Sequence, residues 1–190
     1  RFGSTIAGIE EADVILMVGV NPRWEGPLVN ARIRKRLREG NCKAALIGQP
    51  VNLTYDYAHL GGDLKALLAV VEGTHPFSKI LAQSKSPVVI YGSDVLHSSS
   101  KQREEGTLVL DALRQLEDSL RYVTGKETAI LNYLQPSAGQ LGFTSLGYDA
   151  KEAPEEVDVV FALGVEGRDL RAFCNKTSAK TIAFIGHHGD

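Results

Sequence analysis

The sequence predicts an α/β fold: doubly wound, mostly parallel sheets arranged in two Rossmann-like lobes. Five apolar runs, rich in Val and Ile, are continuous instead of alternating, which is the pattern of strands buried on both faces of a parallel sheet. Stretches with helical periodicity separate the runs, and strands that alternate with helices build doubly wound sheets. A glycine follows each run, and the runs cover residues 14–18, 44–47, 88–91, 157–163 and 181–185.

The expected helices take up stretches between these strands. Residues 27–39 place three apolar side chains four positions apart, on one face of a helix. Pro27 suits the first turn of this helix, and Gly40 suits the position after its last turn. Further helices are expected over residues 64–72, 77–83 and 104–120. Residues 125–149 have weak periodicity, so we expect a loop there, with a short extended segment near residues 130–133.

A weak internal repeat indicates how the chain divides. Residues 11–21 and 156–166 are identical at five of eleven positions, and both lead from an acidic turn through a strand to a glycine turn. The match has two explanations, convergence between similar strands or two related lobes. Two prolines and a polar stretch before residue 87 suit a linker, so we expect lobes over residues 1–84 and 85–190. Because the chain starts without Met and ends five residues after an apolar run, we expect a piece of a longer polypeptide whose second lobe is incomplete at the C-terminus.

Composition and charge exclude several classes of function. The 190 residues carry 21 Lys and Arg against 23 Asp and Glu, a net charge of −2. Nucleic-acid-binding proteins usually have a basic excess, so we expect no nucleic-acid partner. The apolar runs are far shorter than the roughly 18 residues of a membrane span, so we expect no direct membrane insertion. Cys42 and Cys174 lie in unrelated contexts and cannot by themselves supply an iron–sulfur cluster or a structural zinc site.

The strongest candidate for a ligand site is the turn Gly19-Val20-Asn21-Pro22, which follows a strand and precedes a helix. Ligands of doubly wound folds bind at the carboxyl ends of strands, and the N–H groups at the start of a helix favour phosphate. The turn lacks the glycine pattern of a dinucleotide-binding loop, and the chain lacks a P-loop. Two interpretations therefore stay open, a nucleotide-binding turn and a plain strand-to-helix connection.

Other polar groups offer weaker candidates. The expected helix over residues 27–39 carries a basic run, which is either a solvated helix face or a docking surface for an acidic neighbour. The run consists of Arg32, Arg34, Lys35, Arg36 and Arg38. His187 and His188 follow a strand, but only Asp190 lies near them at a spacing that suits a metal ligand. We find no acid–base pair and no nucleophile, so the sequence predicts no catalytic residue and no metal site.

Four blocks of the sequence resemble, in order, the C-terminal region of the large (75 kDa) iron–sulfur subunits of respiratory complex I, NADH:ubiquinone oxidoreductase. The motifs LTYDY and GHHGD are the most specific parts, while residues 94–155 match poorly. The blocks are residues 4–36, 45–61, 75–93 and 186–190. That region in turn resembles the molybdopterin oxidoreductase fold, the body of formate dehydrogenases and nitrate reductases.

The resemblance bears directly on the glycine turn. In molybdopterin enzymes a strand followed by G-x-N-P contacts a guanine nucleotide, and Gly19, Asn21 and Pro22 match that form. The second strand of those enzymes commonly ends in Asp-Pro-Arg, whose acid can bind the nucleotide, whereas Gln49 stands at the corresponding place here. The glycine-rich stretch that approaches the pterin is also reduced, near residues 124–127. The resemblance therefore implies a vestigial nucleotide turn with no bound cofactor.

The same resemblance implies a function for the segment. It would be a non-catalytic scaffold of the complex I large subunit, supporting electron transfer from NADH to ubiquinone in the peripheral arm. The iron–sulfur clusters would lie in the N-terminal part of that subunit, outside this sequence. The implied partners are the rest of the subunit, the NADH-binding flavoprotein and the quinone-module subunits. The implied location is the matrix side of the mitochondrial inner membrane or the cytoplasmic side of a bacterial inner membrane. The alternatives are a fragment of an active molybdopterin-guanine-dinucleotide-dependent oxidoreductase and a free-standing nucleotide-binding module.

Overall fold

The computed structural model divides the chain into two compact units, Arg1–Gly142 and Phe143–Asp190. It describes residues 2–92, 100–125, 127, 129–135, 137, 139–147 and 154–186. Within these residues, no helix combines the length and the apolar character that a bilayer crossing requires.

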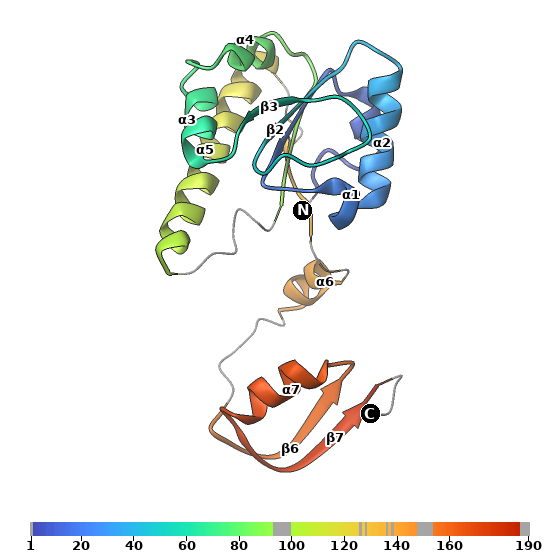
Figure 1. Ribbon diagram of the computed structural model, residues 1–190, viewed down its shortest axis with the longest axis vertical. Coiled ribbons are helices and arrows are strands. Elements are labelled where there is room, and N and C mark those ends of the chain that lie inside the picture. The colour runs from blue at the N-terminus through green and yellow to red at the C-terminus, as the bar shows by residue number, and fades with distance from the viewer. Residues whose placement is uncertain are drawn as a thin grey trace. The chain divides into compact units, whose positions relative to one another are not determined.

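A five-stranded parallel sheet forms the centre of the first unit (Figure 1). Its strand order is β3-β2-β1-β4-β5, so the chain winds outward in both directions from β1. The strands are β1 (Val14–Val18), β2 (Lys43–Ile47), β3 (Ala58–Gly61), β4 (Pro87–Tyr91) and β5 (Leu131–Tyr133). The prediction of a doubly wound, mostly parallel α/β fold is confirmed.

Helices cover both faces of this sheet (Figure 1). Ile15 and Met17 of β1 belong to the apolar cluster that holds Val29 and Ile33 of α2. Leu16 of the same strand packs on the opposite face, in the cluster formed with α3, α4 and α5. Because alternate residues of β1 point to opposite, equally apolar faces, the strand has a continuous apolar sequence. The helical segments are η1 (Ala7–Glu11), α1 (Pro22–Glu25), α2 (Pro27–Arg38), α3 (Leu64–Val71), α4 (Pro76–Ala82) and α5 (Ser100–Thr124).

The division expected after Ser84 does not coincide with the boundary between the two units. Strands β4 and β5 lie beyond Ser84 in the sequence, yet they pair in the same sheet as β1. The polar stretch that suits a linker is instead tied to the start of β1. The backbone N–H groups of Lys85 and Ser86 donate to the carboxylate of Asp13 at 2.7 and 3.0 Å, and the hydroxyl of Ser84 donates to it as well.

The second unit contains a single strand–helix–strand motif. β6 (Glu156–Leu163) and β7 (Ser178–Ile185) are parallel, and α7 (Gly167–Cys174) connects them. A short helix, α6 (Gln140–Ser145), spans the boundary between the units. Three apolar side chains of the β6–β7 sheet are largely exposed: Phe161 at 67%, Leu163 at 65% and Ile185 at 56%.

The two segments of the internal repeat, residues 11–21 and 156–166, also share a backbone conformation at their glycine turns. Gly19 follows β1 with φ of 53°, and Gly164 follows β6 with φ of 58°. The N–H of Gly19 donates to the carbonyl oxygen of Ile47 at 2.9 Å, and the N–H of Gly164 donates to that of Ile185 at 2.8 Å. Each glycine therefore ends its strand in the left-handed region and bonds to the end of the neighbouring parallel strand.

Candidate functional site

The turn over residues 19–22 lies at the carboxyl end of β1, between the ends of β2 and β4. On one side Gly19 bonds to the end of β2, and on the other the N–H of Gly92 donates to the carbonyl oxygen of Val18 at 3.2 Å. The chain runs from β1 toward β2 on one side and from β4 toward β5 on the other, so this is the point where the strand order reverses. Open α/β sheets bind ligands at this point.

A carboxylate from the chain itself occupies the turn. The backbone N–H of Asn21 donates to Oε1 of Glu25 at 2.5 Å. Asn21 immediately precedes α1, so this N–H belongs to the group of donors that bind phosphate at the start of a helix in nucleotide-binding folds. The next residue, Pro22, has no N–H to offer. The turn therefore already holds a negatively charged oxygen.

The strand ends around the turn are closely packed. A Cβ atom added to Gly92 would lie 2.6 Å from the carbonyl oxygen of Gly19 and 2.9 Å from both Glu25 Oε2 and the Cβ of Val20. A Cβ atom added to Gly26 would lie 3.0 Å from Leu134. Main-chain atoms and the side chains of Glu25 and Val20 thus fill the space beside Gly92, between the ends of β1 and β4.

Asn21 has one further feature that bears on a ligand. Its side-chain oxygen Oδ1 is closed to solvent and accepts no hydrogen bond from any described residue. A nucleobase N–H could satisfy such an acceptor, but it could reach Asn21 only after the surrounding side chains had moved. The orphaned oxygen is therefore a feature of the turn that favours a ligand.

The segment after β2, residues 48–50, lies beside the turn. A Cβ atom added to Gly48 would lie 3.4 Å from the backbone nitrogen of Gly19, so the structure brings the two predicted segments together. Gln49, the next residue, is exposed and carries no charge. The carbonyl oxygen of Gly48 lies 2.8 Å from Nε2 of His59, which donates to it in the Nε2–H tautomer. At this edge of the site Gln49 therefore offers a neutral amide.

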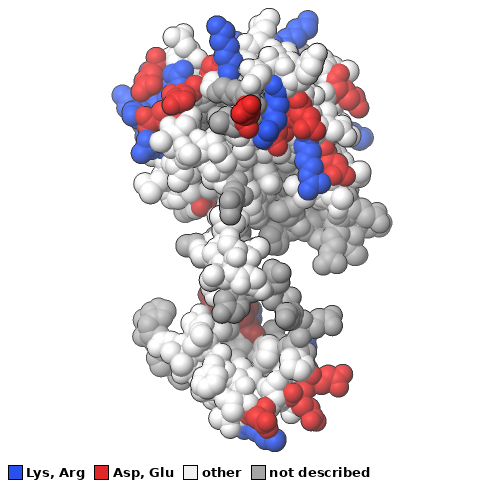
Figure 2. Space-filling model, turned by 180° about the vertical axis from the view of Figure 1, so that it is seen from behind, with Lys and Arg blue, Asp and Glu red and all other residues white. Residues whose placement is uncertain are grey.

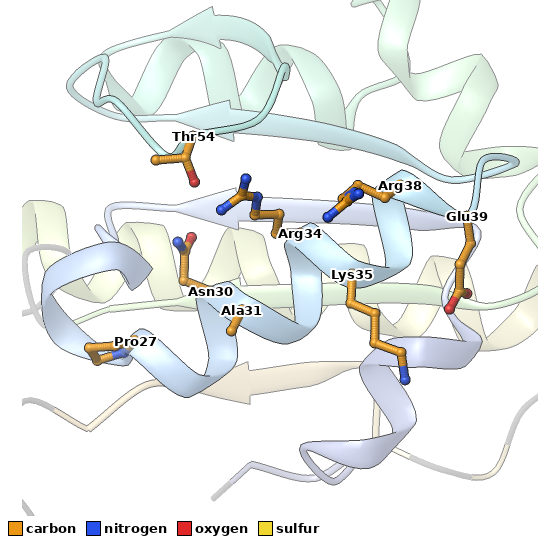
Figure 3. Close-up of a pocket in the computed structure, with 8 residues that line it drawn as sticks. All are labelled: Pro27, Asn30, Ala31, Arg34, Lys35, Arg38, Glu39 and Thr54. Carbon is orange, nitrogen blue, oxygen red and sulfur yellow. The ribbon is translucent and has the colours of Figure 1, made fainter.

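The basic run of α2 divides into two groups. Arg32 and Lys35 form ion pairs with Glu10, which lowers the pKa of that carboxyl. Arg36 donates to backbone carbonyl oxygens and lies 3.8 Å from the carboxylate of Glu39. Arg34 and Arg38, which form no such pairs with described residues, line an open hollow of about 570 Å³ beside the loop that carries Thr54, and Lys35 and Glu39 line it as well (Figure 3). On the face of the first unit seen in Figure 2, basic and acidic side chains are interspersed.

The histidines and cysteines show no site in the described residues. His187, His188, Asp190 and His97 lie outside those residues. His75 accepts the N–H of Phe77 at 3.0 Å and so caps α4. Both cysteines are free, and burial raises the pKa of the Cys42 thiol to about 11. Across the described ranges, no three potential metal ligands come together.

Sequence reasoning missed the role of Glu25. The residue lies four positions after Asn21, the distance at which helical side chains share a face, but such a carboxylate usually points into solvent. In the structure the side chain reaches back along α1 to the N–H of the N-cap residue Asn21, as the acid of a capping box does.

Comparison with known proteins identifies the family. A model of the molybdopterin oxidoreductase family matches residues 1–190. The chain is 35% identical to the NADH-ubiquinone oxidoreductase 75 kDa subunit of Reclinomonas americana, over 97% of this chain and 26% of that protein. It is 32% identical to a subunit of the NADH-quinone oxidoreductase of Rickettsia felis, over 100% of this chain and 27% of that protein. The iron-sulfur protein 1 of mitochondrial NADH dehydrogenase from Solanum tuberosum is 31% identical, over 98% and 24%.

These relatives are much longer than the chain, which spans about a quarter of their length. Among solved structures, the formyltransferase/hydrolase complex (FhcABCD) of Methylorubrum extorquens, solved with methylofuran, is similar in fold. Its matching chain aligns with a TM-score of 0.56 and 18% identity, over 100% of this chain and 62% of that one. At this identity the likeness concerns the fold alone. The match of the family model over the whole sequence shows that the chain belongs to the molybdopterin oxidoreductase family.

Proposed function

We propose that the chain is a segment of the large iron–sulfur subunit of respiratory complex I and acts there as a non-catalytic scaffold. In this role it supports electron transfer from NADH to ubiquinone in the peripheral arm without carrying electrons itself. The relatives named above support the membership. The observation that carries the scaffold role is the hydrogen bond from the backbone N–H of Asn21 to the carboxylate of Glu25.

That hydrogen bond argues against a nucleotide at the turn. A phosphate group and a carboxylate compete for the same N–H donor, and two negative charges at one site repel each other. The repulsion is strongest where water is excluded, and the packing around Gly92 leaves little room for water. A dinucleotide would therefore have to displace Glu25 before its phosphate could bind.

The neighbouring strand end adds a second argument. An acid that accepts hydrogen bonds from a guanine base contributes about 1.5–3 kcal/mol, because one partner is charged. Gln49 has no charge to offer. From both arguments we infer that the residues present do not fit a guanine dinucleotide, and that this segment holds no cofactor. The iron–sulfur clusters of the subunit are assigned to its other parts.

The second unit supports a packing role. A parallel sheet is normally covered on both faces, and Phe161, Leu163 and Ile185 leave an apolar face of the β6–β7 sheet exposed. Exposed apolar faces of this kind mark contacts with further protein. We infer that the rest of the same subunit and other peripheral-arm subunits are the partners. The corresponding location is the inner membrane, on its matrix side in mitochondria or its cytoplasmic side in bacteria.

One observation favours a second candidate, a fragment of an active molybdopterin-guanine-dinucleotide-dependent oxidoreductase. Gly19, Asn21 and Pro22 keep the family form at the point where the strand order reverses, and Asn21 Oδ1 has no hydrogen-bond partner among the described residues. The Glu25 contact and the neutral Gln49 weigh more, since Glu25 competes with the ligand's phosphate and Gln49 offers its guanine base no charged partner.

The two candidates differ in metal and pterin content. The intact assembly that contains this chain is purified, and molybdenum, tungsten and pterin are measured per copy of the subunit. A molybdopterin enzyme prepared in the same way is the control for cofactor loss. We expect less than a tenth of an equivalent in the assembly and about one in the control. A full equivalent of metal and pterin would overturn the scaffold role. Purification of the native protein by itself, without any other complex I subunit, would overturn its membership of the complex.

A further inference from the structure

The five basic side chains of α2 differ in whether they form hydrogen bonds or ion pairs within the first unit. Three of them are satisfied within the first unit, by Glu10, Glu39 or backbone carbonyl oxygens. Arg34 and Arg38 form no hydrogen bond or ion pair with any described residue. Both side chains are exposed and both line the hollow of about 570 Å³. The basic run is therefore not a uniformly solvated face, because two guanidinium groups are left available beside one concave surface.

The two arginines act from the same side of the helix. They are four residues apart, so their side chains are neighbours on one face. Figure 3 shows both side chains turned toward the loop that carries Thr54, whereas the side chains of Lys35 and Glu39, which also line the hollow, end on the side away from that loop. Two guanidinium groups one helical turn apart can each bind a carboxylate through two parallel hydrogen bonds.

The far wall of the hollow is fixed in place. Asn30 of α2 donates to the carbonyl oxygen of Leu53 at 3.4 Å and accepts the hydroxyl of Tyr55 at 2.9 Å. Leu53 is 1% exposed and anchors the loop in the core. Thr54 has φ of 69°, which a β-branched residue rarely adopts. The hollow is therefore preformed, and a ligand would not have to order this wall.

The surroundings favour a protein segment as the ligand. Trp24 and Leu28, in α1 and the first turn of α2, are each 79% exposed. Trp and Arg are enriched among the residues that dominate protein–protein binding energy. Nucleic acid is a poorer candidate, because acidic side chains are interspersed with the basic ones on the face of the first unit that Figure 2 shows.

We infer that the groove between α2 and the Thr54 loop binds an acidic segment of a neighbouring subunit. Arg34 and Arg38 bind two of its carboxylates. This inference rests on the proposed function, because it requires the chain to work inside an assembly.

Zero-length cross-linking tests the contact directly. Arg34→Lys keeps the positive charge and supplies an amine that a carbodiimide couples to a carboxylate in contact with it. The full-length protein carrying this change is assembled, cross-linked and digested, and the linked peptides are identified by mass spectrometry. We expect residue 34 to be linked to an Asp or Glu of another subunit. Links confined to its own chain or to a second copy, or no link at all, would overturn the inference.

Charge reversal tests whether the contact matters for assembly. Arg34→Glu with Arg38→Glu should lower the share of the subunit found in the native assembly by about fivefold or more, because like charges would face each other across the contact. Lys65→Glu with Lys79→Glu is the matched control, since both lysines are exposed on α3 and α4 and the net charge changes equally. We expect the control to assemble normally, and the pair Arg34→Lys with Arg38→Lys, which keeps the charge without the paired hydrogen bonds, to lose much less than the charge reversal.

The outcomes separate this inference from the function on which it rests. Normal assembly of the Arg34→Glu, Arg38→Glu protein, or an equal loss in the lysine control, overturns the docking site and leaves the scaffold role standing. The melting temperature of the unassembled variant, unchanged from the unmodified subunit, shows that a loss of assembly is not a loss of folding. A native protein that occurs in no assembly overturns both.

Discussion

The carboxylate of Glu25 accepts the backbone N–H of Asn21 at 2.5 Å, at the point where the strand order of the sheet reverses. In this family fold the same point is where a ligand is expected. The chain thus keeps the backbone turn of a nucleotide-binding protein and satisfies its donor internally. The fold needs the turn to connect β1 to α1 whether or not a ligand is present, which explains how the architecture can serve as a scaffold.

Replacing Glu25 should destabilise the protein without creating a nucleotide site. Glu25→Ala leaves the Asn21 N–H without its acceptor, and we expect a loss of about 1–3 kcal/mol in the free energy of unfolding. Glu25→Gln keeps an oxygen acceptor and should lose less. Urea unfolding measures both. Because a ligand that binds the folded state raises the melting temperature, a rise on adding guanosine monophosphate to the unmodified protein would contradict the proposed function.

Gly92→Ala should be damaging because the new methyl group has no room. It would lie 2.6 Å from a backbone oxygen of Gly19, which cannot move without disturbing β1. We expect a loss of about 1–3 kcal/mol, typical of overpacking. Gly142→Ala is the control, since nothing lies within 4 Å of the added atom. Denaturant titration that found the two variants equally stable would mean that the strand ends are more loosely packed than described.

Cys42 should react slowly with thiol reagents. Burial raises its pKa to about 11, although the charge of Arg36 acts in the opposite direction. The thiolate is the reactive form, so near pH 7.5 we expect alkylation about a hundred times slower than in the urea-unfolded chain. The rate should rise about tenfold per pH unit between 7 and 10. Peptide-level mass spectrometry measures it, and fast reaction of the folded protein at pH 7.5 would contradict the burial.

The central strands could be predicted from the sequence because burial on both faces leaves an unambiguous pattern. β1 occupies the predicted residues, and β2 and β4 each begin one residue earlier than predicted. β3 was missed because Ala58–Gly61 is an edge strand, with only partly buried or exposed residues and a histidine in its middle. A strand that lies at the edge does not need a continuous apolar sequence.

The unit boundary could not be predicted because it depends on contacts between distant residues, whereas the state of the turn was missed although it depends on a local contact, between Asn21 and Glu25. The polar stretch after Gln83 has the composition of a linker, but Asp13, some seventy positions earlier, binds its backbone. Glu25 looks like a surface carboxylate until its contact with the N–H of Asn21 is known. Composition predicts polarity at such positions, whereas their partners follow only from the fold.

The Asp13 interaction makes stability depend on pH. Burial by itself would raise the pKa of this carboxyl, but the hydrogen bonds from Ser84, Lys85 and Ser86 outweigh burial and hold the pKa below its ordinary value. A carboxyl whose pKa is lower in the folded state stabilises the fold above the unfolded pKa, and this contribution is lost as the pH falls through the folded pKa. Unmodified protein should therefore lose stability in acid, below about pH 4.

Asp13→Asn should remove both the stabilisation and its pH dependence. We expect the variant to be less stable by about 1–3 kcal/mol at pH 6, because bonds to a charged acceptor are lost, and the difference should shrink between pH 4 and pH 2. Asp158→Asn is the matched control from the internal repeat. Asp158 is 80% exposed and pairs with Lys180 alone among the described residues, so its loss should change the free energy of unfolding by less than about 1 kcal/mol. Urea unfolding measures the free energy of unfolding of both variants across this pH range. If the loss for Asp13→Asn stayed constant down to pH 2, the charge of Asp13 would not be what stabilises its contact with residues 84–86.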